Sequence, residues 1–538
     1  MKQLAVLLAL AATVLTTNAI AQENLPKDYL SPAFHAGRRQ ALRDLMPPNS
    51  VAVIFSYPTR TFSNDVTYPY HQNPDLYYFS GYKEPDAVLL IFKEQQKGAN
   101  GSYNELFFVQ KRDPRQEQWT GRRLGVEKTK SELQFTNVYN GSEFAAFPID
   151  LSAFDHILFG GLPDDVHDDL GDPADLFSLL EAFKKKAAIP ADYDAATNEV
   201  LGNIAEYATV QQLSNFKAYF SQQVQSNEKL RNNASMTQFL HCKTAEDLED
   251  FKKKIAATKW NSFLYQKFVG SLRVIKTPEE MDLMRKTCSI SAIAHAEVMK
   301  AIRPGMSEAE LQGLQEYVHK KLGAEYVGYP SIVGGGANGC ILHYEENTRT
   351  NVGRDMVLMD IGAEYHGYSA DVTRTVPSTG KFTPEQKAVY DLVYEAQEAI
   401  FPLCHEGTPF TALNEKATEV LAAGLVRLGI IKDKSQVSLY YPHSCSHYLG
   451  LDVHDVGNYR QALKENMVVT IEPGIYIPAG SPCDKKWWDI GVRIEDDVRI
   501  GKDKEELLSA QAPRRSEDVE QMRTQKSAMT ELVLPAVK

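Results

Sequence analysis

The chain has 538 residues, 43% of them hydrophobic and 10% aromatic, so it is long enough for two domains with large cores. Its formal net charge is -12 and no long basic run offsets this, which argues against a nucleic-acid-binding protein. Six cysteines are scattered without a CxxC pair, which excludes the disulfide framework of a small secreted domain, although one disulfide stays open.

The N-terminus has the features of a secretory signal. Lys2 gives a short positive region, residues 4–15 are apolar, and Ala19-Ile20-Ala21 is a small-x-small cleavage site. The apolar run is too short to span a bilayer, and no cysteine follows the cleavage site, so neither an uncleaved anchor nor a lipid anchor is favoured. The sequence predicts a signal peptide over residues 1–21 and an exported protein, periplasmic or secreted, with no membrane partner.

Residues 28–190 alternate between strand and helix signals. β-rich runs stand at 50–56, 87–92 and 105–110, and the last two are separated by a Gly- and Asn-rich turn, KEQQKGANGSYN (93–104). This alternation of strand and helix signals predicts an α/β domain.

Residues 191–270 are polar, rich in Gln and Lys, and poor in Gly and Pro. Leu248, Phe251 and Ile255 follow at helical spacing after a Thr244-x-x-Asp247 start signal. We therefore expect a helical connector over 191–270.

Three further helix starts organise residues 271–525. Thr277 is an N-cap, Pro278 suits the first helical position, and Glu280 completes a capping box. The stretches MSEAEL (306–311) and FTPEQK (382–387) carry similar helix-start signals. Apolar strand runs such as DMVLMDIG (355–362) lie between these helix starts. Helices and strands therefore alternate in this half too, and residues 526–538 form a C-terminal tail.

Two similar segments of the sequence carry carboxylates at equivalent positions. MVLMDIG (356–362) resembles VVTIEPG (468–474), so that Asp360 and Glu472 each end an apolar strand. A second strand follows in each copy and carries Asp371 or Glu495. The period is too long for a solenoid, so the pattern indicates a duplicated αβ half.

These carboxylates imply a cation. A buried carboxylate is costly unless it is paired or binds a metal. The stretch HSCSHYLGLDVHDVG supplies His443, His447 and His454. Two Asp, two Glu and one His are oxygen-rich ligands that suit a pair of divalent ions, which can share bridging carboxylates and a hydroxide.

The motifs MDIGAEYHGYSADVTRT, HSCSHYLGLDVHDVG, IEPGIY and GVRIEDDV resemble the metal-site motifs of aminopeptidase P and prolidase. In the N-terminal half, YPYHQNPDLYYFSGYKEPDAVLLIF and WTGRRLG resemble the N-terminal domain of aminopeptidase P. The resemblance covers nearly the whole mature chain except about 190–265. It implies an α/β (α+β) protein, with an N-terminal α/β domain followed by a pita-bread catalytic domain with internal pseudo-two-fold duplication.

The resemblance also implies a role for each residue. Asp360 would bind one metal bidentately, Asp371 and Glu495 would bridge both metals, and His447 and Glu472 would complete the other site. The cofactor would be two divalent ions, with manganese favoured and zinc or cobalt acceptable. His366 lies between the first two ligands but matches none, so an exposed turn residue is expected there.

Further residues would contact the substrate. The resemblance places His343 and His454 at the scissile carbonyl, Glu472 as general base, and His443 and Arg493 around a proline pocket. Tyr329 would lie behind the metals. Trp119 would reach the active site of a neighbouring subunit, which implies a homo-oligomer, a dimer or tetramer.

The implied reaction is hydrolysis of the bond between an N-terminal residue and a penultimate proline, by attack of a metal-bridging hydroxide. Prolidase, an Xaa-Pro dipeptidase, is the main alternative, but the short segment IYIPAGSPCDKKWWDI (475–490) resembles aminopeptidase P. Methionine aminopeptidase lacks such an N-terminal domain, and creatinase-like enzymes lack the ligands. A non-catalytic peptide-binding protein would be expected to have lost ligands, and none is missing.

Overall fold

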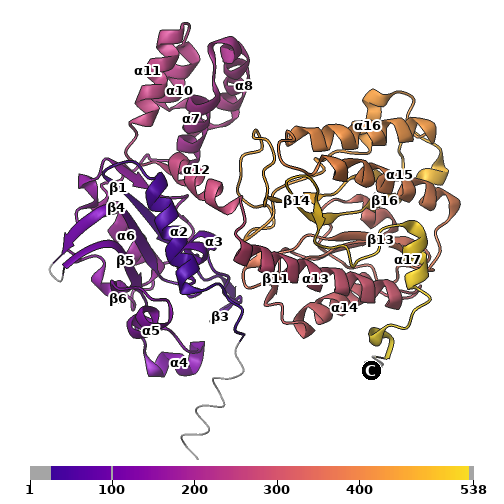
Figure 1. The fold of residues 1–538 in the computed structure, drawn as a ribbon, viewed down its shortest axis with the longest axis horizontal. Coiled ribbons are helices and arrows are strands. Elements are labelled where there is room, and N and C mark those ends of the chain that lie inside the picture. Colours follow the sequence, from indigo (N-terminus) through magenta and orange to yellow (C-terminus); the bar gives the residue numbers. More distant parts are fainter. Residues whose placement is uncertain (1–25, 99–100, 532–538) are drawn as a thin grey trace, which may run out of the picture.

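The computed structural model describes residues 26–98 and 101–531. The predicted signal peptide lies outside these residues and stays a prediction. Figure 1 shows two bodies side by side, an N-terminal sheet domain and a larger C-terminal domain, with a group of helices projecting above the first. Among the described residues, no helix is both long and apolar enough to cross a membrane.

A five-stranded sheet forms the N-terminal domain, in the order β6-β5-β4-β1-β7. Strand β1 lies antiparallel to β4 and parallel to β7. The strands are β1 (Ser50–Phe55), β4 (Val88–Gly98), β5 (Gly101–Val109), β6 (Val138–Asn140) and β7 (His156–Leu158). The helices are α2 (Pro32–Leu45), α3 (Pro74–Ser80), α4 (Pro114–Thr120), α5 (Gly125–Glu132) and α6 (Leu176–Lys186), and β2 (Thr61–Ser63) pairs with β3 (Val66–Thr67).

Both faces of this sheet are buried. Successive side chains of a strand point to opposite faces, so Ala52 and Ile54 of β1 pack with α2 and α3, whereas Val53 and Phe55 pack with α6. All six residues of β1 are buried. This explains why the strand reads as a continuous apolar run.

The predicted turn over residues 93–104 is wrong in extent. Strand β4 continues to Gly98 and β5 begins at Gly101, and Gln96 pairs with Tyr103. The outer part of this hairpin projects into solvent, so its residues are polar although their backbone is extended. The polar composition of residues 93–104 predicts a turn, but here it reflects the exposure of an extended ribbon.

A small helical subdomain follows the sheet domain. It comprises α7 (Ala195–Tyr207), α8 (Leu213–Ser226), α9 (Glu228–Arg231), α10 (Ala234–His241) and α11 (Ala245–Ala256), and α12 (Ser262–Arg273) leads away from it. Thr244 caps α11 in a capping box with Asp247, as predicted. Leu248, Phe251 and Ile255 are buried in the subdomain's own core.

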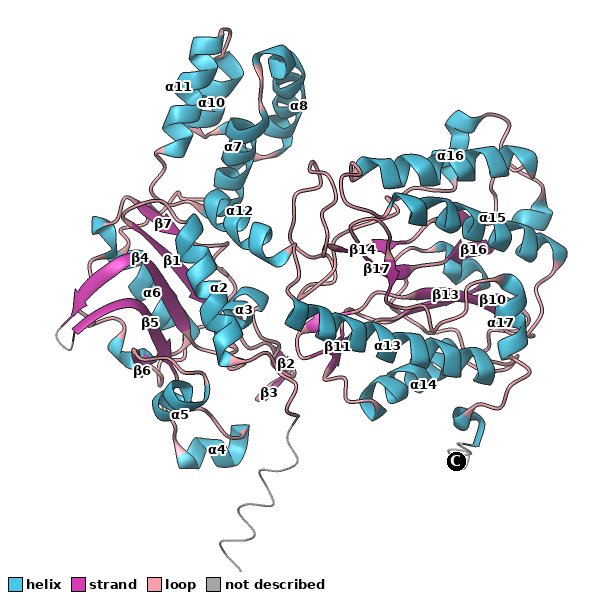
Figure 2. Cartoon of the chain, in the orientation of Figure 1, coloured by secondary structure: helices cyan, strands magenta, loops and turns pink. Residues whose placement is uncertain are grey.

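The C-terminal domain consists of two similar halves. The first has α13 (Pro278–Ala301), α14 (Glu308–Lys321), β8 (Tyr326–Val327), β9 (Ile332–Gly335), β10 (Met356–Asp360), β11 (Ala363–Tyr365), β12 (Tyr368–Ser369) and β13 (Thr373–Pro377). The second has α15 (Pro384–Ile400), α16 (Thr411–Arg427), β14 (Val468–Ile471), β15 (Gly474–Ile477), β16 (Ile490–Arg493), β17 (Asp496–Arg499) and β18 (Glu506–Leu507), followed by α17 (Ser516–Met522). Figure 2 shows one helix pair on each side of the strands. The predicted fold class is confirmed, and the duplication is consistent with the pita-bread fold.

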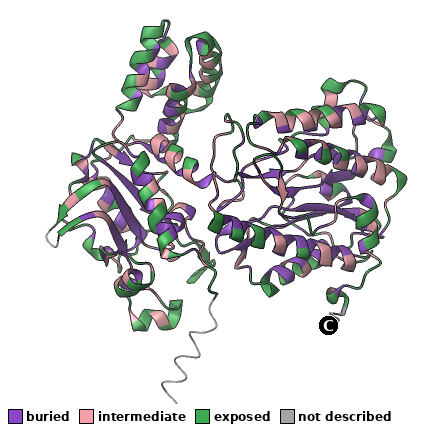
Figure 3. Cartoon of the chain, viewed as in Figure 1, coloured by how far each residue is buried: buried purple, intermediate pink, exposed green. Residues whose placement is uncertain are grey.

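The helix starts agree with the sequence. Thr277 and Thr383 each form a complete capping box at α13 and α15, and Ser307 caps α14. Removing such a cap costs about 1 kcal/mol. Figure 3 shows most strands buried inside both domains, whereas the outer part of the β4–β5 hairpin and the outer helix faces are exposed.

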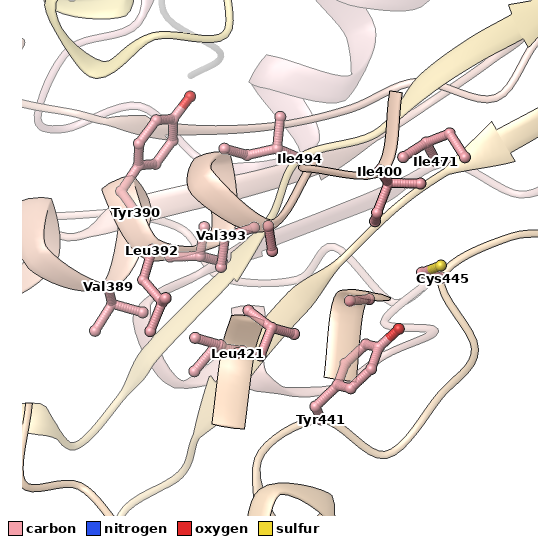
Figure 4. Packing of buried hydrophobic residues seen from close by; sticks show 14 of the residues in the cluster. Val389, Tyr390, Leu392, Val393, Ile400, Leu421, Tyr441, Cys445, Ile471 and Ile494 are labelled. Carbon is pink, nitrogen blue, oxygen red and sulfur yellow. The ribbon is translucent and has the colours of Figure 1, made fainter. Parts of the chain in front are cut away.

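Helix α15 fixes the strand ends that carry the second pair of carboxylates. Ile471 and Ile494 belong to the same buried cluster as Val393 of α15 (Figure 4). The side-chain amide of Gln397 donates to the carbonyl oxygens of Ile471 at 3.0 Å and Ile494 at 3.2 Å. Because Glu472 and Glu495 directly follow these residues, the helix fixes the backbone of both.

All six cysteines lie within the described residues, and all are free thiols. Cys242, Cys288, Cys404 and Cys445 are buried, and Cys340 and Cys483 are half-buried. The disulfide that the sequence left open is not formed.

Buried histidines predict acid sensitivity. Burial lowers the pKa of His35 to about 4 and that of His319 to about 4, whereas an unfolded histidine titrates near 6.5. Below about pH 6.5 the unfolded chain therefore binds more protons, so the free energy of unfolding falls by about 1.4 kcal/mol per pH unit for each of the two groups until about pH 4.

Urea unfolding at pH 7 and pH 5 tests this expectation. Both nitrogens of His319 are buried without a hydrogen-bond partner, so His319→Leu removes one titration without breaking a bond. The variant should lose less stability on acidification than the wild type, and His167→Leu, at an exposed site, should behave as the wild type. An equal loss in His319→Leu and the wild type would contradict the assignment.

Candidate metal centre and active site

Two hairpins bring the carboxylates to one place. Asp360 is the last residue of β10 and pairs with Thr373 of β13, and the backbone N–H of Glu495 donates to the Thr373 carbonyl at 3.1 Å. The two halves therefore meet where the first half carries Asp371 and the second carries Glu495. Asp360, Asp371 and Glu495 are buried.

The glycine of each echoed motif allows a close approach. A Cβ on Gly362 would lie 1.7 Å from the Ala370 carbonyl oxygen, and one on Gly474 would lie 2.5 Å from the Tyr476 hydroxyl. A larger residue at Gly362 would push the two strands of its hairpin apart. The Gly at this position of the motif is thus required by packing beside the site.

One hollow of about 160 Å³ collects most of the predicted site residues. Leu342 and Ser444 complete its wall. The predicted residues that line it are Asp360, Asp371, His447, Glu472, Glu495, His343, His443, His454 and Arg493. The structure therefore brings together all five predicted metal ligands and four of the predicted substrate contacts.

Asp371, His447 and Glu495 are arranged as metal ligands. Each offers a ligand atom, and these atoms all lie within 4.8 Å of one another. The Nε2 atom of His447 lies 3.3 Å from the Asp371 carboxylate and 3.5 Å from the Glu472 carboxylate.

A hydrogen bond at its other ring nitrogen orients His447. Its Nδ1 lies 2.9 Å from the Tyr448 carbonyl oxygen. A carbonyl oxygen can only accept, so Nδ1 carries the proton and Nε2 of the neutral ring is free to coordinate. The Asp371 and Glu472 carboxylates raise the pKa of His447 to about 9 against the effect of burial.

The carboxylates carry more negative charge than the side chains around them compensate. Burial raises the pKa of Glu472 to about 7, and burial with the charge of Asp360 raises that of Asp371. Burial with the charge of Asp371 also raises the pKa of Glu495 far above its usual range. A group of buried carboxylates with raised pKa values around one imidazole is a donor set that divalent cations fit.

Asp360 has its own partner. Burial works to raise its pKa, but the guanidinium of Arg493, at 2.5 Å, and the Tyr329 hydroxyl hold it below its usual range. The Tyr329 hydroxyl lies 2.5 Å from Asp360 and 2.6 Å from Asp371. Tyr329 therefore lies behind two candidate ligands and outside the hollow.

The histidines at the mouth differ in exposure. His343 and His454 are exposed, and the His454 ring stands edge-on to the His447 ring at 4.4 Å between centroids. His443 is half-buried, with Nδ1 2.8 Å from the Ser444 carbonyl oxygen and Nε2 2.9 Å from the Tyr476 hydroxyl. Two imidazoles thus face incoming ligands and one belongs to the wall.

Comparison with known proteins fits this arrangement. The aminopeptidase P N-terminal domain family matches residues 35–153, and metallopeptidase family M24 matches residues 282–502. Xaa-Pro aminopeptidase of Escherichia coli (strain K12) is 33% identical over 495 residues, which cover 90% of this chain and 96% of that protein. This chain belongs to the aminopeptidase P family.

Solved structures of the aminopeptidase P family have the same fold. Proline aminopeptidase P II from Yersinia pestis has a TM-score of 0.71 at 32% identity and covers 92% of this chain and 100% of its own. E. coli aminopeptidase P with the inhibitor Pro-Leu has a TM-score of 0.70 at 30% identity, with 92% and 99% covered. The chain is thus a hydrolase of a metallopeptidase family.

Trp119 lies apart from the site in this aminopeptidase P chain. It is 89% exposed on α4 and borders a hollow of the N-terminal domain that is rich in Asp. No residue of α4 is buried. The predicted contact is with another subunit, so the single chain leaves it a prediction.

The prediction that His366 is exposed is wrong. It does lie in the turn between β11 and β12, with a positive φ of 51°, but only 1% of it is exposed. Its ring stacks on Tyr29 at 3.6 Å, and its Nε2 lies 2.9 Å from the Asp28 carboxylate. A distant segment covers it, which no local pattern reveals.

Sequence reasoning missed two residues that support the aminopeptidase P site. The Tyr476 hydroxyl accepts from Arg493 at 2.9 Å and contacts His443. Strand alternation does not mark Tyr476, because Glu472 lies between β14 and β15 and Tyr476 lies within β15. Asp497 accepts the backbone N–H of Asp371 at 3.1 Å, and no sequence signal marks that contact.

Proposed function

We propose that this chain is a dinuclear-metal Xaa-Pro aminopeptidase. One observation carries the proposal: the five predicted ligands and four predicted substrate contacts line a single hollow. The relatives named Xaa-Pro aminopeptidase align over nearly the whole chain, which supports the same substrate class here. Expected substrates are peptides with proline at position two.

The ligand roles follow from chemistry and position. Asp360 would hold one ion, Asp371 and Glu495 both, and His447 and Glu472 the other. When bound, two divalent ions lower the pKa of water and polarise the scissile carbonyl. Four carboxylates make an oxygen-rich donor set, so we propose manganese, with zinc or cobalt as alternatives.

The chain's own groups move the protons. The Glu472 carboxylate lines the hollow beside the other candidate ligands, so it can take a proton from the attacking water and return it to the prolyl nitrogen. His343 and His454, both exposed at the mouth, can donate hydrogen bonds to the carbonyl oxygen as negative charge develops there.

The wall of the hollow offers a proline pocket. His443, Tyr476 and Arg493 are joined by hydrogen bonds of 2.9 Å, so they present a fixed surface. The amide nitrogen of an Xaa-Pro bond has no hydrogen to donate. Shape against the pyrrolidine ring would therefore supply selectivity, and a close-fitting pocket discriminates by roughly 10–200-fold.

The alternatives are less favoured. The segment between β15 and β16 is short and closed, because the N–H of Asp489 donates to Ile477 and its carboxylate accepts from Ala479. The prolidase resemblance would call for a long insertion at this point. A non-catalytic peptide-binding protein on this fold would have no need of the complete ligand set.

The proposal also includes the export of the protein and its assembly into a homo-oligomer. The signal at residues 1–21 supports export to the periplasm or medium. The exposed Trp119 supports a homo-oligomer in which α4 of one subunit reaches the site of another.

Matched tripeptides test the function. The mature chain with manganese should release the first residue from Xaa-Pro-Xaa at least about tenfold faster than from Xaa-Ala-Xaa. Removing metal with a chelator should abolish cleavage, and returning manganese should restore it. Equal cleavage of both tripeptides, or full activity after chelation, would refute the proposal.

A further inference from the structure

A large cavity lies outside the metal centre, at the junction of the two domains. Its volume is about 640 Å³, within the range of pockets that bury small ligands. It opens at the carboxyl ends of the parallel strands β1 and β7, where α/β sheets commonly bind ligands. Helix α12 and the catalytic-domain residues Asp452 and Val456 close it.

Lining residues that neighbouring hollows share connect this junction cavity to the metal centre. His454 lines both the metal-centre hollow and a neighbouring hollow of about 380 Å³. That neighbouring hollow shares His71 and Asp452 with the junction cavity. The loop Leu451–His454 therefore contributes to the walls of all three hollows, from the candidate ligands to the N-terminal domain.

The walls of the junction cavity are aromatic and electrically balanced. Tyr57, Tyr68 and Tyr70 line it, and Tyr57 and Tyr68 are 44% and 52% exposed, which is high for large rings. Of its two arginines, Arg273 is paired at 2.7 Å with both Asp75 and Asp452, and Arg60 is paired at 2.9 Å with Asp165. Exposed rings beside compensated charges suit apolar and aromatic groups better than charged ones.

We propose that the junction cavity binds the residues that follow the proline of a longer peptide substrate, and favours aromatic and apolar ones. This inference rests on the proposed function. An aminopeptidase has one residue before the scissile bond, so only the part after the proline can reach a second cavity. An extended peptide advances about 3.3 Å per residue and can follow the Leu451–His454 loop.

Two variants separate the cavity from the metal centre. A Cβ on Gly161, which lines the cavity, would have no other atom within 4 Å, so the side chain of Gly161→Trp starts in open space and adds bulk to the cavity wall. The second is the double variant Tyr57→Ala with Tyr68→Ala, which removes two partly exposed rings. Tyr317→Ala is the matched control, because Tyr317 is 47% exposed on α14 and lines none of the hollows described above.

The test compares kcat/KM for a Pro tripeptide and for a decapeptide with the same first three residues and a Phe- and Leu-rich remainder. The manganese-loaded wild type should prefer the decapeptide by about tenfold. Both cavity variants should lose that preference, with tripeptide cleavage within about twofold of the wild type, and Tyr317→Ala should keep it. Unchanged Tm values would show that the variants fold.

Two results would overturn the inference. One is a wild type that cleaves both peptides equally well, and the other is a decapeptide preference that survives in both variants. A wild type that cleaves neither peptide would instead refute the proposed function and the inference with it.

Discussion

Asp371→Asn is expected to lower kcat/KM for a Pro tripeptide by about a thousandfold or more, since loss of a residue that merely supports a metal ligand already costs about 10–100-fold. Asp371 is the natural centre of the site. Its carboxylate lies 3.3 Å from the Nε2 of His447, within 4.8 Å of the Glu495 carboxylate and 2.6 Å from the Tyr329 hydroxyl. The substitution keeps the shape of the side chain and removes its charge.

Stability separates this effect from unfolding. Burial and the charge of Asp360 raise the pKa of Asp371, so its carboxylate is unfavourable in the metal-free protein. Metal-free Asp371→Asn should therefore melt at the same temperature as the metal-free wild type or above it, and bind less metal. Asp503→Asn, at an exposed site, is the control. A variant with more than a tenth of wild-type activity and full metal content would contradict the ligand role.

Arg374→Met is expected to lower the free energy of unfolding by about 3–5 kcal/mol, as loss of one partner of a buried ion pair does. Arg374 and Asp496 are both fully buried and lie 2.7 Å apart. The guanidinium also donates to the carbonyl oxygens of Ala512 and Pro513. The substitution leaves these carbonyl groups without their donor, and it leaves Asp496 with only the more distant Arg514, at 3.4 Å, as a counter-ion.

Urea unfolding with two further variants tests the Arg374 assignment. Arg427→Met removes an exposed ion pair with Glu395 and should cost less than about 1 kcal/mol. Replacing Asp496 with Leu in the Arg374→Met background should recover part of the loss, because the buried carboxylate that has lost its nearest partner is then gone and Arg514 still pairs with Glu398. A loss below about 1 kcal/mol in Arg374→Met would show that the buried pair does not stabilise the fold.

Local signals predicted the secondary structure where backbone and side chain act within one turn. The caps at Thr244, Thr277 and Thr383 rest on contacts three residues apart, and all three helices start there. The outer β4–β5 hairpin was missed because its polar residues face solvent on a two-stranded ribbon. In the sequence, the polar residues of this exposed ribbon cannot be distinguished from the polar residues of a turn.

The site was predictable to the extent that its motifs are contiguous. Asp360 and Glu472 each end an apolar strand, and the rest followed from a resemblance to known motifs. His366 and Asp497 depend on contacts between segments far apart in the chain, with Asp28 and Asp371. Such pairing is set by tertiary packing and leaves no local pattern.

The junction of the two domains was likewise beyond local reasoning. Arg273 at the end of α12 binds Asp75 of the N-terminal domain and Asp455 of the catalytic domain. Lys276 adds a bond of 2.9 Å to Asp455. This buried cluster fixes the loop that carries His454, so the N-terminal domain takes part in shaping the site.

The most direct test of the central claim is product analysis by mass spectrometry. The mature, manganese-loaded chain would be offered an Xaa-Pro-Xaa tripeptide and the matching Xaa-Pro dipeptide. The account predicts release of the first residue from the tripeptide, with an intact Pro-Xaa product. Cleavage of the dipeptide alone would identify a prolidase, and no cleavage of either peptide by a chain with two bound metals would contradict the proposed function.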